Sequence, residues 1–512
     1  MGKTTAIILA AGKGTRMRSS RTKVLHPFLG RPMLFGPLDA AIRAGSSEVV
    51  VVVGHQADAV KRTVEKSFPG WPIRFVEQTE QRGTGHAVQC ALPFVGDAEE
   101  LLILCGDTPL VSARLLAGLL DRHRKGKNAL TVASFTAPDP TGYGRIARDS
   151  DGQVRAIVEH RDASPEELAI AEVNAGIYVT STGALRAALQ ALKPHNAQGE
   201  LYLTDAVAWI AERGDKVDTA MLPNADEVRG VNTLAQLAEL EEVALAEVRL
   251  AWMERGVSLQ SPHTIRIEAA VEIGRDTTIG PGAQLLGRTR IGQGCRIDVG
   301  AVLINCEIGD GVRILPYTVA ESARIATQAA VGPFTHLRPG TELGEKTKIG
   351  NFVEIKKSRF GAGSKASHLS YIGDATIGRN VNIGAGTITC NYDGVNKFET
   401  IIEDGVFIGS DTQLVAPVRV GANAVVGAGT TVTRDVPAGS LVVTRAPHKE
   451  IGGYYERRVL PRKLAKAAGN TPTVEAVPVG SAPSPFAMRT EPVAADSGDD
   501  PSPAPAAPKN EV

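Results

Sequence analysis

Aliphatic side chains recur at every sixth position in the second half of the chain. One run extends from Ile267 to Leu303 and another from Ile402 to Val432, and glycine follows many of their members, as in Ile273-Gly274 and Val426-Gly427. A period of six fits neither a helix face nor the alternation of a strand. It is typical of a parallel β-helix, in which each hexad forms one short flat face and a corner where glycine relieves crowding. The pattern predicts a β-helix over residues 258–445.

The first 230 residues alternate strand-like and helix-like segments. Such alternation predicts an α/β domain over residues 1–230, with a mostly parallel sheet and helices on both faces. The clearest predicted strands and helices are Ala6–Leu9, Val49–Val53, Leu101–Leu104, Met33–Ala44 and Ala57–Lys66.

Three further segments complete the predicted organisation. Residues 231–257 are rich in Ala, Leu and Glu at helical spacing, which predicts a long helix linking the two domains. Two stretches, Gly361–Tyr371 and Cys390–Thr400, interrupt the six-residue period and are expected to leave the β-helix as loops. We expect residues 446–469 to form a C-terminal arm, and residues 470–512, rich in Pro, Ala and Ser, to be a disordered tail.

Composition narrows the class of protein. At 512 residues the chain is expected to hold at least two domains, and its 4% aromatic content suits a thin coil filled by aliphatic side chains. Equal numbers of acidic and basic residues, 56 of each, argue against nucleic acid as the main partner. Five scattered cysteines without a CxxC pair favour reduced thiols, and no apolar run is long enough to span a membrane. The sequence therefore predicts a soluble, cytoplasmic protein.

A glycine-rich loop follows the first predicted strand. In the segment Leu9–Met17, glycines allow close approach of the backbone to a ligand, and Lys13 and Arg16 add positive charge suited to phosphates. Its spacing matches neither a Walker A loop nor a dinucleotide-binding GxGxxG. The alternative is a tight turn with solvated basic residues.

Two other residues of this half carry candidate chemistry. Asp107 ends an apolar strand and is placed where a carboxylate can hold Mg²⁺ against nucleotide phosphates, although it can also cap the turn before Pro109. Lys23 is either a phosphate ligand or a surface lysine.

His368 is the candidate catalytic group of the second half. It lies near Lys356 and Tyr371 in the first interruption of the repeat, and an imidazole there can accept a proton from an amine near neutral pH. The alternative is a histidine that only packs or caps a loop.

Ordered motifs reveal a resemblance. LAAGKGTRM, KVLH, CGD, TGYGRI, IVEH, VNAG and GVN occur in the order found in sugar-1-phosphate nucleotidyltransferases. From about residue 5 to residue 445, the chain resembles the bacterial bifunctional N-acetylglucosamine-1-phosphate uridylyltransferase / glucosamine-1-phosphate N-acetyltransferase family. The resemblance implies a Rossmann-like domain, a left-handed β-helix and a cytoplasmic homotrimer. It also implies synthesis of UDP-N-acetylglucosamine, a precursor of peptidoglycan and lipopolysaccharide, from glucosamine-1-phosphate, acetyl-CoA and UTP with Mg²⁺.

The resemblance also implies a uridylyl-transfer site in the first domain. There an oxygen of N-acetylglucosamine-1-phosphate attacks the α-phosphate of UTP, a reaction that needs in-line geometry and cations. The implied Mg²⁺ ligands are Asp107 and Asn232, the uracil-reading residues Gln78, Gly83 and Thr84, and the sugar-binding residues Gly144, Glu159 and Asn174. The remaining implied nucleotide-binding residues are Leu9, Ala10, Ala11, Gly12, Arg16, Lys23, Cys105 and Gly106.

A second implied site lies on the β-helix, where His368 would be the general base for acetyl transfer. The implied sugar-phosphate ligands are Arg338, Lys356, Tyr371 and Asn382. The implied acetyl-CoA ligands are Ala385, Asn391, Tyr392, Ser410, Ala428 and Arg445.

Two alternatives stay open at this point. One is a nucleotidyltransferase for another nucleotide or sugar with a regulatory or trimerising β-helix, and the other is a β-helix that serves only as a scaffold and binding surface. The segment around His368 and the pair Asn391-Tyr392 argue against the first alternative, since a regulatory coil needs neither. Mass measurement with acetyl-CoA present would separate the second alternative from the enzyme.

Overall fold

The computed structural model describes residues 3–194, 198–445 and 448–469, and the predicted tail 470–512 lies outside them. The chain divides into two compact units, Met1–Arg445 and Ala446–Val512. In the described part of the second unit, a π-helix (Tyr455–Val459) continues into α9 (Leu460–Ala467).

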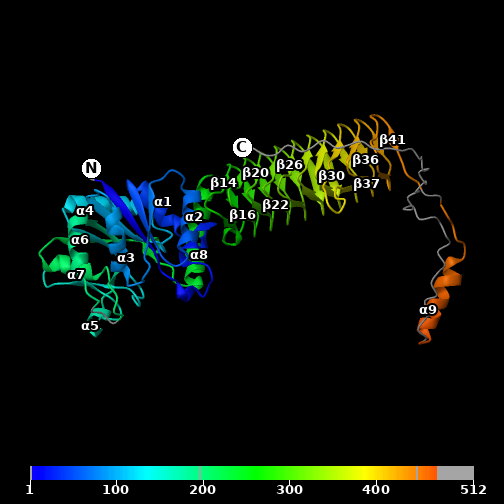
Figure 1. Cartoon of the computed structure of the whole chain (residues 1–512). Helices are drawn as coiled ribbons and strands as arrows, with labels where there is room; N and C mark the ends of the chain where they lie inside the picture. The colour runs from blue at the N-terminus through cyan, green and yellow to red at the C-terminus, as the bar shows by residue number, and fades with distance from the viewer. Residues whose placement is uncertain (1–2, 195–197, 446–447, 470–512) are drawn as a thin grey trace, which may run out of the picture. The chain divides into compact units, whose positions relative to one another are not determined.

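A twisted sheet forms the centre of the N-terminal domain (Figure 1). In the described residues its order is β11-β7-β10-β6-β1-β4-β5, with β8 and β9 attached beside β10. The strands of this sheet are β1 (Thr4–Ala10), β4 (Glu48–Val53), β5 (Ile73–Glu77), β6 (Glu100–Cys105), β7 (Leu130–Thr136), β8 (Arg145–Arg148), β9 (Val154–Val158), β10 (Glu172–Ser181) and β11 (Val217–Met221). Pairing is parallel from β6 through β1 and β4 to β5, while β10 is antiparallel to both neighbours. The prediction of a mostly parallel sheet is confirmed.

Helices cover both faces of this sheet. Alternate residues of β1 enter two different cores: Ile8 packs with α1, α2 and α4, whereas Ile7 packs with α3, α6 and α7. This alternation is the strand periodicity that a sheet buried on both sides requires. The helices are α1 (Phe35–Arg43), α2 (Ala57–Ser67), α3 (Thr84–Ala91), α4 (Ala113–Gly126), α5 (Pro165–Leu168), α6 (Thr182–Ala191) and α7 (Asp205–Glu212), and a small hairpin pairs β2 (Pro27–Phe28) with β3 (Arg31–Pro32).

A long helix, α8 (Leu234–Glu254), lies between the N-terminal sheet and the first strands of the β-helix. Thr233 and Gln236 form a capping box at its start. Glu241 on this helix accepts a hydrogen bond from the backbone N–H of Leu29 at 2.8 Å. The same carboxylate forms an ion pair with Arg266 at 2.9 Å. The helix thus contacts the N-terminal domain and the first coil of the β-helix through one carboxylate.

Three parallel sheets form the β-helix, which is the arrangement of a left-handed hexapeptide-repeat coil. The β12 sheet contains β12 (Ser258–Leu259), β15 (Thr278–Ile279), β18 (Arg296–Ile297), β21 (Arg313–Ile314), β24 (Ala330–Val331), β27 (Lys348–Asn351), β30 (Lys365–His368), β33 (Asn382–Ile383), β36 (Phe407–Ile408), β39 (Val425–Val426) and β41 (Leu441–Val442). The β13 sheet contains β13 (Arg266–Ile267), β16 (Gln284–Leu286), β19 (Val302–Ile304), β22 (Val319–Glu321), β25 (His336–Leu337), β28 (Glu354–Lys356), β31 (Tyr371–Gly373), β34 (Ile388–Cys390), β37 (Gln413–Val415) and β40 (Thr431–Val432). The β14 sheet contains β14 (Glu272–Ile273), β17 (Arg290–Ile291), β20 (Glu307–Ile308), β23 (Arg324–Ile325), β26 (Glu342–Leu343), β29 (Arg359–Phe360), β32 (Ala375–Ile377), β35 (Thr400–Ile402) and β38 (Val418–Val420).

The predicted loop at Gly361–Tyr371 is wrong. The coil continues through this stretch as β30, with Ala366 fully buried in the core between Phe360 and Ile372. The six-residue spacing is intact, but alanine and phenylalanine occupy core positions that Ile, Val or Leu fill in most other coils, so the pattern looked broken. His368 consequently lies at the end of a strand.

The interruption after Cys390 is a real one. Residues 391–399 leave the coil between β34 and β35, and an antiparallel bridge joins Tyr392 to Lys397 within this segment. We call residues 391–399 the insertion loop.

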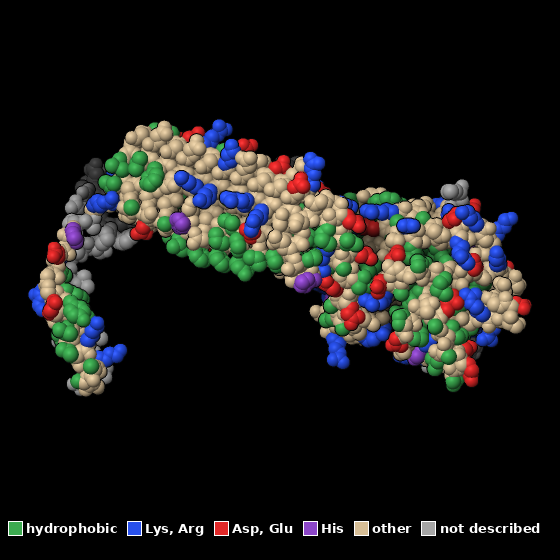
Figure 2. Space-filling view, turned by 180° about the vertical axis from the view of Figure 1, so that it is seen from behind, with side chains coloured by type: hydrophobic (Ala, Val, Ile, Leu, Met, Phe, Trp, Pro, Cys, Tyr) green, Lys and Arg blue, Asp and Glu red, His purple; other side chains and the backbone are tan. Residues whose placement is uncertain are grey.

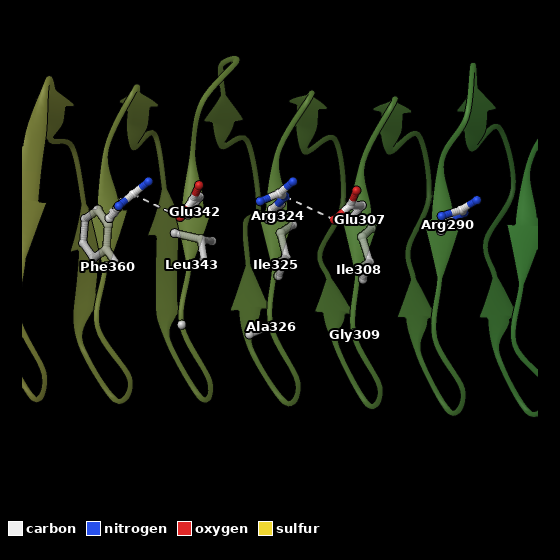
Figure 3. Close-up of a pocket in the computed structure, with 12 residues that line it drawn as sticks. Arg290, Glu307, Ile308, Gly309, Arg324, Ile325, Ala326, Glu342, Leu343 and Phe360 are labelled. Carbon is white, nitrogen blue, oxygen red and sulfur yellow. Dashed lines mark ion pairs between the residues drawn. The ribbon is translucent and has the colours of Figure 1, made fainter.

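Alternating charges line the outward face of the β14 sheet (Figure 3). Arg324 pairs with Glu307 at 3.1 Å, and Arg359 pairs with Glu342 at 3.1 Å. These side chains border a shallow groove of about 640 Å³ that contains none of the predicted site residues. Because the pairs are exposed, each contributes about 0.2–1 kcal/mol, and they favour the in-register stacking of coils.

Candidate functional site

The carboxyl ends of β1 and β6 meet at one edge of the N-terminal sheet. Leu9 is opposite Cys105 in the parallel register, and the backbone N–H of Gly106 donates to the carbonyl of Leu9 at 2.9 Å. The glycine-rich loop after β1 therefore lies beside Asp107, which follows β6. The sequence predicts this meeting, because ligands of open α/β sheets bind at the carboxyl ends of strands.

Oxygen atoms of Asp107 and Asn232 converge on one cationic position. The Lys23 ammonium forms an ion pair with Asp107 and donates to Asn232 Oδ1 at 3.1 Å, and Arg16 donates to the same Oδ1 at 2.8 Å. The backbone N–H of Val231 donates to the Asp107 carbonyl at 2.9 Å, which holds the two segments together. A carboxylate and an amide oxygen directed at one positive group suit Mg²⁺, a cation that takes oxygen ligands and keeps several waters.

A cavity of about 280 Å³ opens beside this position. Gln78, which is 5% exposed, lies in its wall, and Gln81 donates to the Ala11 carbonyl at 2.7 Å. The predicted residues that line it are Leu9, Ala10, Ala11, Gly12, Lys23, Gln78, Gly83, Thr84, Cys105 and Asp107. Sequence reasoning missed Val24, Gln81, Ala87 and Glu200. Gln81 and Glu200 lie outside any recognised motif, and only the fold brings them to the cavity.

Burial fixes the state of the thiol in this wall. It raises the pKa of Cys105 to about 12, with Asp107 as a second cause. The thiol therefore stays protonated near neutral pH, and it donates to the Gly176 carbonyl at 3.7 Å. Cys105 is a packing residue of the cavity and has no nucleophilic thiolate.

The three predicted sugar-binding residues lie on neighbouring strands and loops of the same domain. The backbone N–H of Asn174 donates to the Gly144 carbonyl at 2.9 Å, and a Cβ on Gly144 would stand 3.5 Å from Glu159 Oε1. Burial raises the pKa of Glu159, whose Oε1 accepts from Thr204 at 3.0 Å. Glu159 lines a different hollow, between β9 and α7, so the nucleotide cavity itself does not contain these three residues.

On the β-helix, predicted residues share one corner of successive coils. Asn351 is opposite His368 in the β27–β30 register. Extending the pairings of β30 with β33, β36 and β39 by two residues places Ala385, Ser410 and Ala428 next along the same corner. Arg445 ends this row and donates to the Ala428 carbonyl at 2.7 Å. The predicted general base and four predicted acetyl-CoA ligands thus form a continuous row.

Asn351 controls which nitrogen of His368 is basic. Its side-chain oxygen lies 3.1 Å from His368 Nδ1. An amide oxygen only accepts, so Nδ1 carries the proton and the lone pair is on Nε2. His368 is exposed, which leaves Nε2 accessible to a substrate. Sequence reasoning missed Asn351 because the coil register alone brings it beside His368.

The other predicted ligands gather around Asp374. Lys356 forms an ion pair with Asp374 at 3.3 Å, and Asn391 of the insertion loop donates to the same carboxylate at 2.5 Å. Lys356 in turn holds the pKa of the nearby Lys397 below its ordinary value. Asp374 therefore ties the coil to the insertion loop.

Within one chain these two groups of ligands stay apart. His368 precedes β31, whereas Asp374 follows it, so they lie at opposite ends of one strand. Tyr371 starts this strand, and its hydroxyl lies over Gly373. Arg338 lies on the coil before Lys356 and next to it, and it pairs with Glu354 at 2.9 Å. The last two predicted ligands are farther along the chain: Asn382 is on the β12 sheet and Tyr392 is on the insertion loop.

Comparisons with known proteins agree with this architecture. The MobA-like NTP transferase domain family matches residues 6–206, and the bacterial transferase hexapeptide family, with six repeats, matches residues 399–434. The chain is 51% identical over 455 residues to the bifunctional protein GlmU of Pelobacter propionicus, covering 89% of this chain and 98% of the relative. The chain belongs to the GlmU family. GlmU of Trichlorobacter lovleyi is 50% identical over 455 residues (89% and 98% covered), and GlmU of Sorangium cellulosum is 48% identical over 470 residues (91% and 98% covered).

Membership of the GlmU family confirms the resemblance on which the sequence interpretation rests. The chain is a bifunctional transferase with a nucleotidyltransferase domain and a hexapeptide-repeat acyltransferase domain. In the described parts of this GlmU chain, we find no helix with the length and apolar character needed to span a bilayer.

Proposed function

We propose that this GlmU chain synthesises UDP-N-acetylglucosamine in two steps. The β-helix transfers the acetyl group of acetyl-CoA to glucosamine-1-phosphate, and the N-terminal domain then joins the product to the uridylyl group of UTP and releases pyrophosphate. The observation that carries this proposal is the presence of two separate constellations in one chain. One is the convergence of Asp107, Asn232 and Lys23, and the other is the row of ligands that begins at His368.

In the uridylyl step, the chain's own residues bind and orient. The backbone of Leu9–Gly12 lines the nucleotide, and Lys23 and Arg16 place positive charge at the phosphates. Asp107 and Asn232 would hold Mg²⁺, which when bound neutralises charge on the phosphates. The sugar phosphate is itself an anionic nucleophile, so the step needs alignment and cations rather than a protein base.

In the acetyl step, His368 Nε2 accepts a proton from the amine of glucosamine-1-phosphate as the nitrogen attacks the thioester carbonyl. Asn351 holds the imidazole in the required tautomer. The row Ala385, Ser410, Ala428 carries the coenzyme along the corner, and Arg445 at its end suits coenzyme phosphates. The C–S bond of the thioester breaks, and the departing CoA sulfur takes the proton held by His368, so that CoA leaves as the free thiol and the imidazole is neutral again.

Product analysis tests substrate choice. With Mg²⁺, glucosamine-1-phosphate and acetyl-CoA present, mass spectrometry should find UDP-N-acetylglucosamine when UTP is supplied. Comparable yields of the ADP or GDP sugar from ATP or GTP would overturn the assignment of the nucleotide.

We also propose that three copies assemble through one corner of the β-helix. Figure 2 shows hydrophobic side chains gathered along one edge of the coil. On successive coils Tyr317, Phe334 and Phe352 stack with ring centroids 5.4 and 5.5 Å apart, and Leu369 continues the row; their exposed fractions are 52%, 50%, 55% and 63%. We call these four residues the apolar ridge. An exposed row of this kind is unfavourable on a monomer and suits burial against identical chains.

The ridge ends beside the acetyl site, because Leu369 follows His368 directly. Assembly would bring a neighbouring copy against His368. That copy would supply the cluster around Asp374, which within one chain lies at the other end of β31 from His368. This accounts for the separation of His368 from the cluster around Asp374.

Phe334→Glu should therefore convert trimers into smaller species and lower acetyl transfer at least tenfold, while uridylyl transfer persists. Burying a carboxylate at three equivalent positions is strongly unfavourable. Sedimentation velocity and separate assays of the two reactions measure both effects. Lys346→Glu is the matched control, since Lys346 is an exposed corner residue with a similar φ (56° against 53°) between β26 and β27. A Phe334→Glu trimer with normal acetyl transfer would contradict the proposed interface.

A further inference from the structure

The amide of Gln78 has its orientation determined by two acceptors. Gln78 follows β5, and its Nε2 donates to the Gly83 carbonyl at 3.0 Å and lies 3.2 Å from His86 Nδ1. A carbonyl oxygen only accepts, so the amide must present its NH₂ group to Gly83. Its second N–H then points to His86, and Oε1 is the atom left for a ligand in the cavity.

The two acceptors are held firmly. Gly83 has a φ of 101°, and a Cβ there would stand 2.5 Å from the Leu201 carbonyl, so its backbone has little freedom. His86 is in the first turn of α3, and its Nε2 lies 3.7 Å from the Sγ of Cys90, one turn later. Burial raises the pKa of Cys90, so this sulfur belongs to a neutral thiol.

These contacts define one tautomer of His86. Since Nδ1 accepts from Gln78, the ring proton of the neutral imidazole is on Nε2 and points toward Cys90 Sγ. If the Gln78 amide turned over, its Oε1 would face both the Gly83 oxygen and the lone pair of His86 Nδ1. Neither acceptor would then have a donor.

We propose that His86 is a positioning residue for base selection in the uridylyl site: it holds Gln78 with Oε1 toward the nucleotide. An acceptor there pairs with the N3–H of uracil and opposes cytosine, whose N3 is also an acceptor. The inference rests on the proposed function, in which Gln78 contacts the base. A base that lacks the matching donor leaves the Gln78 oxygen unpaired in the site, and a site that hydrogen-bonds its substrate discriminates strongly against such a base.

Two substitutions separate this role from simple packing. Asn places an amide oxygen near the position of Nδ1, whereas Leu has similar bulk and no acceptor. The ratio of kcat/KM for UTP to that for CTP, measured with N-acetylglucosamine-1-phosphate, should fall about tenfold or more in His86→Leu, mainly through a higher KM for UTP. In His86→Asn it should stay within about threefold of the wild-type ratio.

An unchanged ratio in His86→Leu, or an equal loss in both variants, overturns the inference. A wild-type enzyme that does not prefer UTP contradicts the proposed function instead, so the two failures are distinguishable. Nitrogen-15 chemical shifts of the His86 ring in the wild-type protein give a second test that does not depend on variants folding. A proton on Nδ1 would overturn the inference, and a proton on Nε2 supports it.

Discussion

His368→Ala should lower acetyl transfer by roughly a hundredfold to ten-thousandfold, the usual contribution of a positioned general base. Without the imidazole, the row that continues through Ala385, Ser410 and Ala428 loses the proton acceptor at its start, and the attacking amine keeps its proton. Release of free thiol from acetyl-CoA measures this step. Uridylyl transfer from supplied N-acetylglucosamine-1-phosphate should persist, because His368 belongs to the other domain.

Asn351→Ala provides a graded comparison. It should reduce acetyl transfer less than His368→Ala, because the base remains but its tautomer is no longer held by the contact at 3.1 Å. Normal acetyl transfer by a folded His368→Ala enzyme would exclude His368 as the base and shift attention to Tyr371 or Lys356.

Asp107→Ala should abolish pyrophosphate release, with a loss of roughly a hundredfold or more, and leave acetyl transfer nearly intact. The carboxylate is one of two protein oxygens that converge on the cation position, and the removal of its charge weakens the hold on Mg²⁺. Pyrophosphate release at several Mg²⁺ concentrations measures the effect. EDTA should likewise stop only the uridylyl reaction.

Asp121→Ala is the matched control for this substitution, since Asp121 is exposed on α4 and pairs only with Lys125 in the described residues. It should change neither reaction. If acetyl transfer fell as far as uridylyl transfer in a folded Asp107→Ala enzyme, the two sites would not be independent.

The six-residue pattern predicts the β-helix well because each short face of the coil directs one side chain into the narrow core. That side chain is usually aliphatic, so the period of six is visible in the sequence. It is detectable only where the phase is constant. The step from Leu303 to Ile308 is one residue short, as is the step from Ile355 to Phe360, so the phase of the repeat changes between one run of coils and the next. The mistaken loop at Gly361–Tyr371 has a different origin: the spacing is intact there, but Phe360 and Ala366 occupy core positions where the pattern is recognised by Ile, Val or Leu.

The candidate sites divide along similar lines. The meeting of the glycine-rich loop with Asp107 follows from strand order, because both leave the carboxyl end of a parallel strand. The contact of Gln81 with Ala11, 70 residues apart, depends on the path of a loop that no local pattern encodes. Asn351 is opposite His368 only through the register of two coils. The sequence alone does not reveal such contacts between residues far apart in the chain, because they depend on loop paths and on the pairing of coils.

The most direct measurement of the central claim is an incubation of the full chain with glucosamine-1-phosphate, acetyl-CoA, UTP and Mg²⁺, with free thiol and pyrophosphate followed separately. Thiol release should precede pyrophosphate release. Omission of acetyl-CoA should abolish pyrophosphate formation, and added N-acetylglucosamine-1-phosphate should restore it. Pyrophosphate formation from N-acetylglucosamine-1-phosphate without any thiol release from the complete mixture would show that the β-helix is a scaffold and would contradict the two-reaction account.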